Sequence, residues 1–364
     1  MAETATATPP APPGAQAAAD TAALAEARTL VRDLYTPRAP RYWVDFLLSA
    51  GIGWAAFVAA VVWPAWSGQQ AAALAVSVVA LYRAVIFVHE LAHLGPRKWP
   101  GFRAVWNLLC GGPILVQSYT YSGVHNLHHY QHLYGTQADG EYLPFARMRL
   151  LAVFGHWALA VVVPVIVLVR ALILVPLSWL IPPLARWLWA HASSLVIDPA
   201  FKRPHSRHDD PGWRWQDAYS WLCASTGVGL MASGVWPWRV LVVWYLMLTG
   251  ILMLNGVRTL IAHRYRFPGE RPLTLMEQFH DSVDVPGHPL VTPLWAPVGL
   301  RFHATHHLFP GMPYHNLGTA YQRLATSLSD PAWFLRSSER NMVGAMRKLV
   351  RESQASEALR GVKA

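Results

Sequence analysis

The fold of this chain is decided by residues 71–93, which read AAALAVSVVALYRAVIFVHELAH. Apart from Arg83, residues 71–89 are largely apolar, and their length is close to the roughly 20 residues that an α-helix needs to cross a bilayer core. The stretch ends in His89 and His93, which are four residues apart and therefore share one face of a helix. It predicts a membrane span that presents two imidazoles at its water-facing end.

Further apolar runs predict the rest of the membrane domain: residues 46–63, 151–185, 216–235 and 239–262. The run 151–185 is broken by prolines and flanked by basic residues at both ends, so we expect it to return to the side from which it starts. Residues 106–119 are apolar but short, and we expect an interfacial or re-entrant segment. Because Lys and Arg mark cytoplasmic loops, every histidine-rich segment falls on the cytoplasmic face. The sequence predicts an all-α integral membrane protein with four spans plus a membrane-dipping hairpin, or six spans, and a cytoplasmic helical cap that bears histidine boxes.

The composition agrees with a membrane protein. Of the 364 residues, 53% are hydrophobic and 14% are charged, whereas globular domains carry about 25% charged residues. Several of the 18 tryptophans lie near the ends of apolar runs, where aromatic side chains favour the membrane interface. The net charge of +10 is accompanied by no nucleic-acid recognition motif. We therefore expect the basic residues to lie beside anionic lipid and expect no nucleic-acid partner.

We expect three regions along the chain. Residues 1–25 are rich in alanine, proline and threonine and predict a disordered N-terminal tail. Residues 26–325 form the membrane domain with its cap, and residues 326–364 form a basic C-terminal helix or tail. The expected location is a membrane, most simply a bacterial inner membrane, with the active site on its cytoplasmic face.

Histidines recur in ligand-like spacing at the ends of these segments. The nine histidines concerned are His89, His93, His125, His128, His129, His263, His303, His306 and His307. Positions i, i+3 and i+4 share one helix face, so each box presents two or three imidazoles together. Neutral imidazole binds iron, zinc, copper and nickel, and nine rings are too many for one ion. They suit two ions, and a nitrogen-rich pair with room for oxygen favours iron over zinc, which usually takes about four ligands.

Other kinds of metal protein share part of this pattern. His89-Glu90-x-x-His93 matches the HExxH motif of zinc proteases, but no apolar segment offers an acidic third ligand, and the two HxxHH boxes would be idle. Glu90-x-x-His93 is also half of a carboxylate di-iron site in a helix bundle, which needs that motif twice. A non-enzymatic metal-binding membrane protein remains a further alternative, although the spans carry few polar residues.

The boxes HxxxH, HxxHH and HxxHH, in this order and at these offsets from the spans, resemble those of the membrane fatty acid desaturase superfamily. That superfamily also contains acyl hydroxylases and carotenoid ketolases. Residues 303–317, HATHHLFPGMPYHNL, are especially similar, and the resemblance covers about residues 40–325. It implies two iron ions held by the eight box histidines, with His263 as a ninth ligand. It also implies an Asn four residues earlier, where this chain has Thr259, with Asn255 one turn further back.

The resemblance implies that O2 is used to remove hydrogen from an unactivated methylene. The leading expectation is desaturation of the acyl chain of a lipid or thioester. Hydroxylation or ketolation of a lipid or carotenoid at the same centre is the alternative. The three intervening residues of the first box favour the acyl-lipid, sphingolipid or ketolase branches. Because the chain has no His-Pro-Gly-Gly haem motif, we expect a separate electron donor of the ferredoxin, rubredoxin or cytochrome b5 type.

Polar residues near the boxes are candidates to orient the ligands, because a metal-bound imidazole usually donates its other N–H to a carboxylate or carbonyl. These candidates are Glu90, His132, Asp139, Glu141, Asp281, Asp284 and His315. Asp139 and Glu141 follow the second box directly and are best placed, whereas His315 is expected to form structural hydrogen bonds. Arg83 is unfavourable within a membrane, so we expect it to pair with a carboxylate or a lipid head group.

Overall fold

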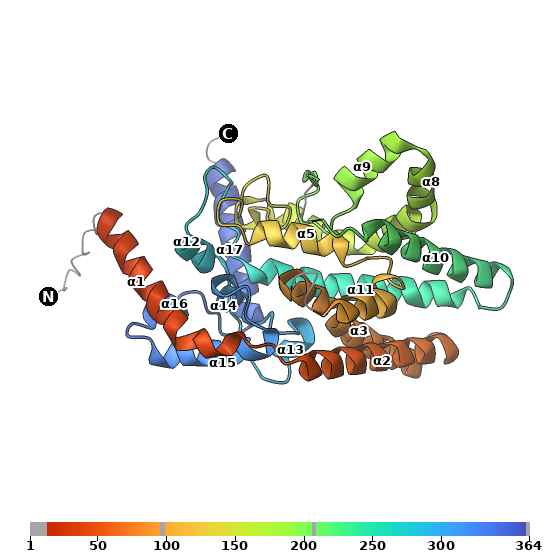
Figure 1. Cartoon of the computed structure of the whole chain (residues 1–364), viewed down its shortest axis with the longest axis horizontal. Coiled ribbons are helices and arrows are strands. Elements are labelled where there is room, and N and C mark those ends of the chain that lie inside the picture. The colour runs from red at the N-terminus through yellow and green to blue at the C-terminus, as the bar shows by residue number, and fades with distance from the viewer. Residues whose placement is uncertain (1–12, 95–98, 206–208, 362–364) are drawn as a thin grey trace.

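The computed structural model describes residues 13–94, 99–205 and 209–361, and this part of the chain contains helices and no β-strand. Long helices run side by side, and shorter ones gather at one end of them (Figure 1). The prediction of an all-α membrane protein is confirmed.

In the described ranges, four helices are long and apolar enough to cross a membrane: α2 (Ala39–Val62), α3 (Gly68–Leu94), the continuous run Val163–Leu180 and α11 (Arg239–Ala262). Glycines allow these helices to approach closely. A Cβ atom at Gly53 of α2 would lie 2.5 Å from Cγ of Leu81, and one at Gly250 of α11 would lie 2.8 Å from Cγ2 of Val78. α3 is therefore packed between α2 and α11 at the centre of the bundle.

The proline-containing run expected as a hairpin is divided into short helical pieces. These are α6 (Leu150–Ala158), η4 (Leu159–Val161), α7 (Val163–Val169), η5 (Arg170–Leu174), α8 (Val175–Leu180) and α9 (Pro182–Ala192). α7, α8 and α9 each have a proline in their first two positions, where the missing N–H has no intrahelical partner to lose. The chain reverses between α8 and α9, which pack against each other (Figure 1).

α10 (Trp213–Ala232) covers most of the run 216–235 that we expected to span, but it is not among the four candidates. Its first turns carry polar residues, of which Asp217 and Ser220 are buried. Asp217 of α10 pairs with Arg170 of η5, with Nη1 and Oδ1 2.9 Å apart. α10 thus starts beside a charged pair within the apolar layer, which explains its lower hydropathy.

The short apolar run 106–119 does not span, as we expected. It includes the end of α4 (Pro100–Trp106) and a π-helical turn, η2 (Asn107–Gly111), and it leads into α5 (Tyr119–His128). The chain turns at Leu115, which has a left-handed φ of 63°. The side chain of Asn107 accepts from the backbone N–H of Ser118 at 2.9 Å and donates to its hydroxyl at 3.0 Å. These bonds fix the entry into α5.

The cap consists of the remaining helices: α1 (Pro13–Val31), η1 (Arg32–Tyr35), η3 (Phe145–Arg147), α12 (Leu275–Asp281), α13 (Thr292–Trp295), α14 (His303–Leu308), α15 (Tyr314–Ser327), α16 (Ala332–Leu335) and α17 (Met342–Gly361). One of its apolar cores joins Val31 of α1 to Leu317 of α15 and Phe334 of α16. α17 occupies the expected basic C-terminal region and runs across the direction of the long helices (Figure 1).

The structure corrects the disordered tail that we expected over residues 1–25. α1 begins at Pro13, and residues 1–12 lie outside the described residues. Alanine has the highest helix propensity, and Ala27 and Val31 bury their side chains in the cap. The alanine-rich composition therefore produces a helix because a docking surface is available.

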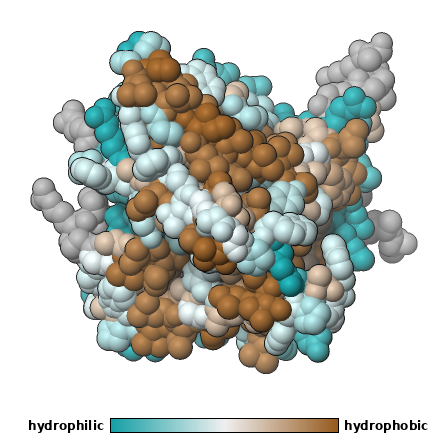
Figure 2. Space-filling view, turned by 90° about the vertical axis from the view of Figure 1, so that its right-hand side faces the viewer, coloured by the Kyte–Doolittle hydropathy of each residue, from teal (hydrophilic) through white to brown (hydrophobic). Residues whose placement is uncertain are grey.

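The end of the bundle opposite the cap has large apolar areas on its surface (Figure 2). Trp66, in the α2–α3 turn, and Trp238, before α11, are exposed, as expected for side chains at a membrane interface. An apolar groove of about 700 Å³ lies between α2, α10 and α11, and its lining includes Trp54, Leu115 and Trp244.

Candidate metal centre

Four segments that are far apart in the sequence bring the nine histidines together where the long helices meet the cap. The first box lies on the last turns of α3, the second on the last turn of α5 and the residue after it, and the third on α14. His263 directly follows the last residue of α11. Seven of the nine are buried, and His93 and His129 are half-buried.

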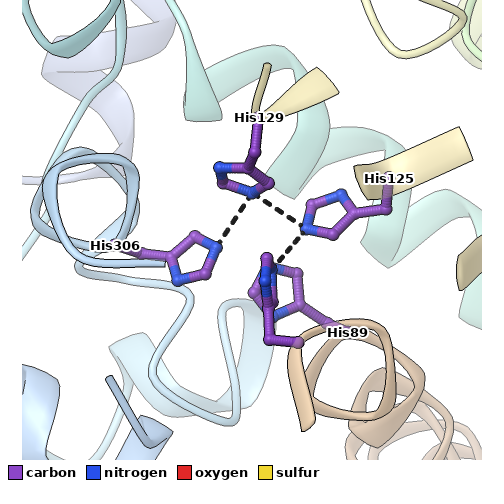
Figure 3. A group of neighbouring side chains, drawn as sticks. His89, His125, His129 and His306 are labelled. Atoms are coloured by element: carbon purple, nitrogen blue, oxygen red, sulfur yellow. Dashed lines mark hydrogen bonds between the residues drawn. The ribbon is translucent and has the colours of Figure 1, made fainter. Parts of the chain in front are cut away.

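The nine imidazoles form two groups. The five-histidine group contains His89, His93, His125, His129 and His306, and the four-histidine group contains His128, His263, His303 and His307. Within each group, one ring nitrogen from every residue lies within 4.8 Å of the others. Figure 3 shows members of the five-histidine group turned toward one another from α3, α5 and α14.

Rings in both groups point their Nε2 atoms inward. Nε2 of His125 lies 3.0 Å from Nε2 of His93 and 3.1 Å from Nε2 of His129. In the four-histidine group, Nε2 of His263 lies 2.9 Å from Nε2 of His303. Lone pairs on neighbouring nitrogens repel at these distances unless a proton or a cation lies between them.

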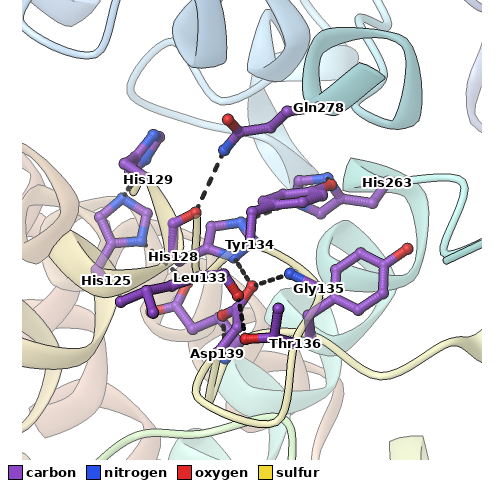
Figure 4. A network of polar contacts seen from close by, with 12 residues as sticks. His125, His128, His129, Leu133, Tyr134, Gly135, Thr136, Asp139, His263 and Gln278 are labelled. Atoms are coloured by element: carbon purple, nitrogen blue, oxygen red, sulfur yellow. Dashed lines mark hydrogen bonds and ion pairs between the residues drawn. The ribbon is translucent and has the colours of Figure 1, made fainter. Parts of the chain in front are cut away.

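Three of the four outer Nδ1 atoms of the four-histidine group have polar partners, and Figure 4 shows the surroundings of His128 and His263. Nδ1 of His128 lies 2.8 Å from Oδ2 of Asp139, and because a carboxylate only accepts, the imidazole proton lies on Nδ1. Nδ1 of His263 lies 2.8 Å from the hydroxyl of Tyr134, which itself donates to Oδ2 of Asp281 at 2.9 Å. Both rings therefore turn an unprotonated Nε2 toward the group.

The partners of the four-histidine group are themselves fixed. Backbone N–H groups of Gly135 and Glu141 donate to the two oxygens of Asp139 at 2.9 and 3.0 Å. Gly135 has a left-handed φ of 71°, which glycine adopts without steric cost. The side-chain amide of Gln278 lies 3.2 Å from Nδ1 of His307. The loop after α5 and helix α12 thus orient three of the four rings.

The five-histidine group has fewer such partners. Nδ1 of His125 lies 2.9 Å from Oε2 of Glu141 and 3.0 Å from the hydroxyl of Tyr121. Several buried nitrogens in this group lack a polar partner among the described residues: Nδ1 and Nε2 of His89, Nδ1 of His129 and Nδ1 of His306. Within the described part of the chain, a carboxylate lies at hydrogen-bond distance from only one of its five rings.

Burial keeps most of these imidazoles neutral. Burial is the main cause that holds the pKa of six of them well below the usual value, and repulsion from neighbouring imidazoles adds to it. These six are His125, His129, His263, His303, His306 and His307. Burial also disfavours the charged form of His128, but the Asp139 carboxylate outweighs it and raises the pKa. Neutral imidazole is the form that binds a metal ion.

These donors fit two metal ions. Nε2 atoms converge in each group, the buried Nε2 of His89 has no polar partner, and no carboxylate among the described residues belongs to either group. A cation inside each group would bind the lone pairs and remove their repulsion. All-nitrogen sets suit iron, copper, nickel or zinc, but five nitrogens exceed the four ligands that zinc usually takes.

The acidic residues expected to orient the ligands divide into direct and indirect partners. Asp139 and Glu141 contact imidazoles directly, and Asp281 acts through a tyrosine. Asp284 contacts no imidazole; it accepts from the backbone N–H and the hydroxyl of Thr305 at 3.0 and 2.6 Å. Burial raises the pKa of Asp284 to about 7. It fixes α14 rather than a ring.

Glu90 points away from both groups. It accepts from the hydroxyl of Tyr42 and from the backbone N–H of Tyr314, the latter at 3.1 Å. Its Oε1 lies 3.7 Å from Nδ1 of His89, which is beyond hydrogen-bond distance. Glu90 thus ties α3 to α15. Glu90 is therefore not placed to act as the catalytic carboxylate that a zinc protease with an HExxH motif requires. The HxxHH boxes, which that interpretation leaves idle, lie in the same centre as His89 and His93.

Two expected histidines lie outside the centre. The prediction that His132 orients a ligand is wrong, because the side chain is exposed and stacks on Tyr130 in the turn after α5. His315 accepts from the backbone N–H of Arg38 at 3.1 Å, which is the structural role that we expected. Arg83 pairs with Asp45 of α2, with Nε and Oδ1 2.6 Å apart, so the expected carboxylate partner is confirmed.

Several polar neighbours of the rings were not expected from the sequence. Tyr134 connects a histidine to Asp281, and the hydroxyl of Ser282 lies 3.2 Å from Nδ1 of His263. Gln278 could have been found, because it lies three residues before Asp281 on α12 and shares its helix face. Tyr134 carries no comparable signal, since its position depends on the loop after α5.

A departure from the pattern implied by the resemblance lies one turn before His263. Thr259 stands at the position where an Asn was implied. The guanidinium of Arg258 donates to its hydroxyl at 3.2 Å and to the side-chain oxygen of Asn255 at 3.1 Å. Both polar side chains are therefore engaged by an arginine within the membrane-spanning helix.

Comparison with known proteins adds two findings. A family model described as "Fatty acid desaturase" matches residues 70–337. The chain is also 40% identical over 344 residues to a protein of Caulobacter vibrioides (strain NA1000 / CB15N) described as ceramide hydroxylase. That similarity covers 94% of this chain and 97% of the relative.

Proposed function

The chain belongs to the fatty acid desaturase family, and we propose that it hydroxylates a ceramide-class lipid at a di-iron centre. Membership of the family and the hydroxylase relative make it a membrane oxidoreductase that acts on a lipid. The finer proposal is carried by the 40% identity over nearly the whole length of both chains. The two histidine groups supply a donor set that fits the required metals.

Desaturation, the leading expectation from sequence, is the second candidate. The family description favours it, and both reactions begin by removing hydrogen from the same kind of methylene. They differ in whether oxygen is then transferred to carbon or a neighbouring hydrogen is lost. The relative described as a hydroxylase supports hydroxylation as our first candidate.

The five- and four-histidine groups would each hold one iron ion. When bound, the pair supplies O2 reduction: one oxygen atom enters a C–H bond of the lipid, and the other leaves as water with two electrons and two protons. We propose that a separate donor protein provides the electrons and that the centre faces the cytoplasm. Net basic charge on the chain favours an acidic electron donor.

The protein's own contribution is to orient the rings and to exclude water. Asp139 and Glu141 accept the outer N–H of a ring in each group and so set which nitrogen faces the metal. Apolar residues of α3 and α14 bury the centre, with His306 and Thr305 fully covered. Exclusion of water prevents side reactions during oxygen chemistry.

The proposal is tested by lipid analysis. The chain is expressed in a bacterial host that makes ceramide but lacks this activity, and the ceramide is analysed by mass spectrometry. We expect the gain of one oxygen atom per molecule. Loss of two hydrogen atoms instead would select the second candidate, and unchanged ceramide in the presence of a competent electron donor would contradict both.

His128→Ala and His132→Ala form a matched pair of variants for this test. Both remove a histidine from the α5 region, but only His128 belongs to the four-histidine group. We expect the first to abolish product and the second to retain it. Equal activity in both would contradict the assignment of the centre.

A further inference from the structure

The candidate membrane spans contain five arginines, of which Arg41 and Arg239 lie in the first turns of their helices. The three in the interior of a span differ in their partners. Arg83 of α3 pairs with Asp45 of α2, and Arg170 of η5 pairs with Asp217 of α10. Each pair neutralises its charge and joins two helices. Arg258 of α11 has no carboxylate partner among the described residues. An ionisable side chain in this position indicates a functional site unless a structural partner explains it.

The hydrogen bonds of Arg258 leave part of its guanidinium unused. Its Nη2 donates to Asn255 and Thr259, both on α11 itself. Its Nε is buried and has no partner among the described residues. The guanidinium also interacts with the Tyr82 hydroxyl of α3, but unlike the other two arginines Arg258 forms no ion pair with a carboxylate among the described residues. The unpartnered Nε is free to bind another molecule.

Arg258 lies on the membrane side of the metal centre and close to it. It precedes His263 by five residues, which corresponds to about 7.5 Å along a helix axis. Its positive charge adds to burial and to neighbouring imidazoles in lowering the pKa of both His263 and His303. The guanidinium also reaches the neighbourhood of the Tyr82 hydroxyl on α3.

Tyr82 completes a polar patch in an otherwise apolar layer. Its side chain is fully buried, and its hydroxyl donates to the backbone carbonyl of Trp295 in α13 at 3.1 Å. We call Tyr82, Asn255, Arg258 and Thr259 the polar patch. It lies where α3, α11 and α13 meet, directly beside the histidine groups. A centre that oxidised only the middle of a hydrocarbon chain would not need such groups.

We propose that the polar patch binds the amide and hydroxyl oxygens of the lipid's polar head, with Arg258 as the principal donor. This proposal rests on the proposed function. Neutral carbonyl and hydroxyl oxygens can accept a hydrogen bond from the unpartnered Nε, and such bonds are strong where water is excluded. Because the patch lies beside the metal centre, the head is held there too, and the oxidised carbon is a few bonds from the amide.

The test uses the full-length protein in lipid nanodiscs and measures binding as well as turnover. The variants are Arg258→Leu and Arg258→Lys, with Arg351→Leu on the exposed face of α17 as the control. The probes are a ceramide, a fatty acid and a hydrocarbon of equal chain length. Binding is measured by tryptophan fluorescence on protein stripped of metal, so the readout does not depend on activity.

We expect Arg258→Leu to weaken ceramide binding by about tenfold or more, which is the effect of losing hydrogen bonds from a charged donor. Hydrocarbon binding should be unchanged, and the product should be hydroxylated at several positions instead of one. Arg258→Lys keeps the charge but not the planar fork, so it should give an intermediate loss. Arg351→Leu should match the wild type in every measurement.

Unchanged ceramide affinity together with a single product position in Arg258→Leu would overturn the proposal, as would a larger loss of fatty acid affinity than of ceramide affinity. If Arg258→Leu fails to fold, an intermediate loss of ceramide affinity in Arg258→Lys still supports the proposal, and wild-type affinity with a single product position in that variant contradicts it. A wild-type protein that binds ceramide but adds no oxygen would refute the proposed function and leave the binding site standing.

Discussion

The two histidine groups are built from the same residue type, yet their surroundings differ. All members of the four-histidine group are buried, and three of the four have a polar partner on Nδ1. The five-histidine group has two half-buried members and one ring that is held by a carboxylate. A small hollow of about 60 Å³ is lined by His93, Tyr42 and Gly311, whereas the hollow lined by His263 has a volume of only about 10 Å³. The four-histidine group is thus the more rigid and the more enclosed, and the five-histidine group is the looser and the more accessible.

This difference indicates a division of labour within one centre. Oriented rings bind a metal tightly because little freedom is lost on binding. Rings without fixed partners can move when a small molecule enters. We expect the ion of the four-histidine group to be the retained one and the ion of the five-histidine group to be the exchangeable one.

The largest expected effect is the loss of one ligand from either group. His306→Ala and His303→Ala should both reduce product below detection, and the metal content should fall from about two ions per chain to about one. Metal analysis and product analysis of purified protein check this. Two ions and full turnover in both variants would show that these histidines are not ligands.

A second effect separates the partners of the two groups. Asp139→Asn and Glu141→Gln remove the charge that orients one ring in each group, and loss of such a partner lowers metal affinity by about 10- to 100-fold. Asp139→Asn should release the ion of the four-histidine group and Glu141→Gln that of the five-histidine group. Metal titration of each variant, with exposed Glu270→Gln as the control, measures this. Identical titrations for the two variants would contradict the separation.

The difference in rigidity between the two histidine groups is tested by the rate at which each loses its metal ion to a chelator. His303→Ala protein should keep its ion in the five-histidine group, and His306→Ala protein should keep its ion in the four-histidine group. We expect the first to lose its ion about tenfold faster, because its rings are less well oriented. The opposite order would reverse the assignment of the rigid and the accessible group.

A smaller effect comes from the contact between Tyr134 and His263. Tyr134→Phe leaves Nδ1 of His263 and the Asp281 carboxylate with one partner fewer, which should destabilise the fold by about 1–3 kcal/mol. Thermal unfolding of the metal-free protein measures it. Tyr130→Phe, a nearby half-exposed tyrosine, should change nothing. An unfolding temperature for Tyr134→Phe equal to that of the wild type would show that the hydrogen bond between Tyr134 and His263 does not stabilise the fold.

The smallest effect concerns the helix that supports the four-histidine group. α12 begins with a capping box formed by Thr274 and Glu277, and Thr274→Ala should destabilise the protein by about 1 kcal/mol.

The hydrogen bond from Arg271 lowers the pKa of Glu277 from 4.5 to about 2. The stability from this carboxylate is therefore present above about pH 4.5 and is lost as the pH falls toward 2. Unfolding measured across this range should show the loss in wild type and not in Glu277→Gln.

The sequence identified the histidines because their spacing is a local property of a helix. It did not show how they divide. In each box, the two histidines that are four residues apart fall in the same group. The remaining histidine of each HxxHH box, His128 or His306, belongs to the other group. Adjacent residues such as His128 and His129 point in directions about 100° apart on a helix. One helix end can therefore serve two metal ions.

Features that depend on tertiary packing could not be predicted in the same way. The position of Tyr134 follows from a loop that closes through Gly135 and Asp139. α1 forms from a sequence that is typical of disorder because the cap offers it an apolar surface. His132 has ligand-like spacing from His129, but α5 ends first, and the side chain turns to solvent. Periodicity predicts a face only as far as the helix continues.

The groove of about 700 Å³ between α2, α10 and α11 has a practical consequence for purification. In a bilayer, hydrocarbon tails fill a hollow of this kind, and after extraction detergent tails take their place. A short or bulky detergent fills it poorly, and unfilled apolar space lowers stability. The thermal midpoint of the extracted protein should therefore rise with detergent tail length, and the choice of detergent is an experimental variable wherever variants of this protein are compared.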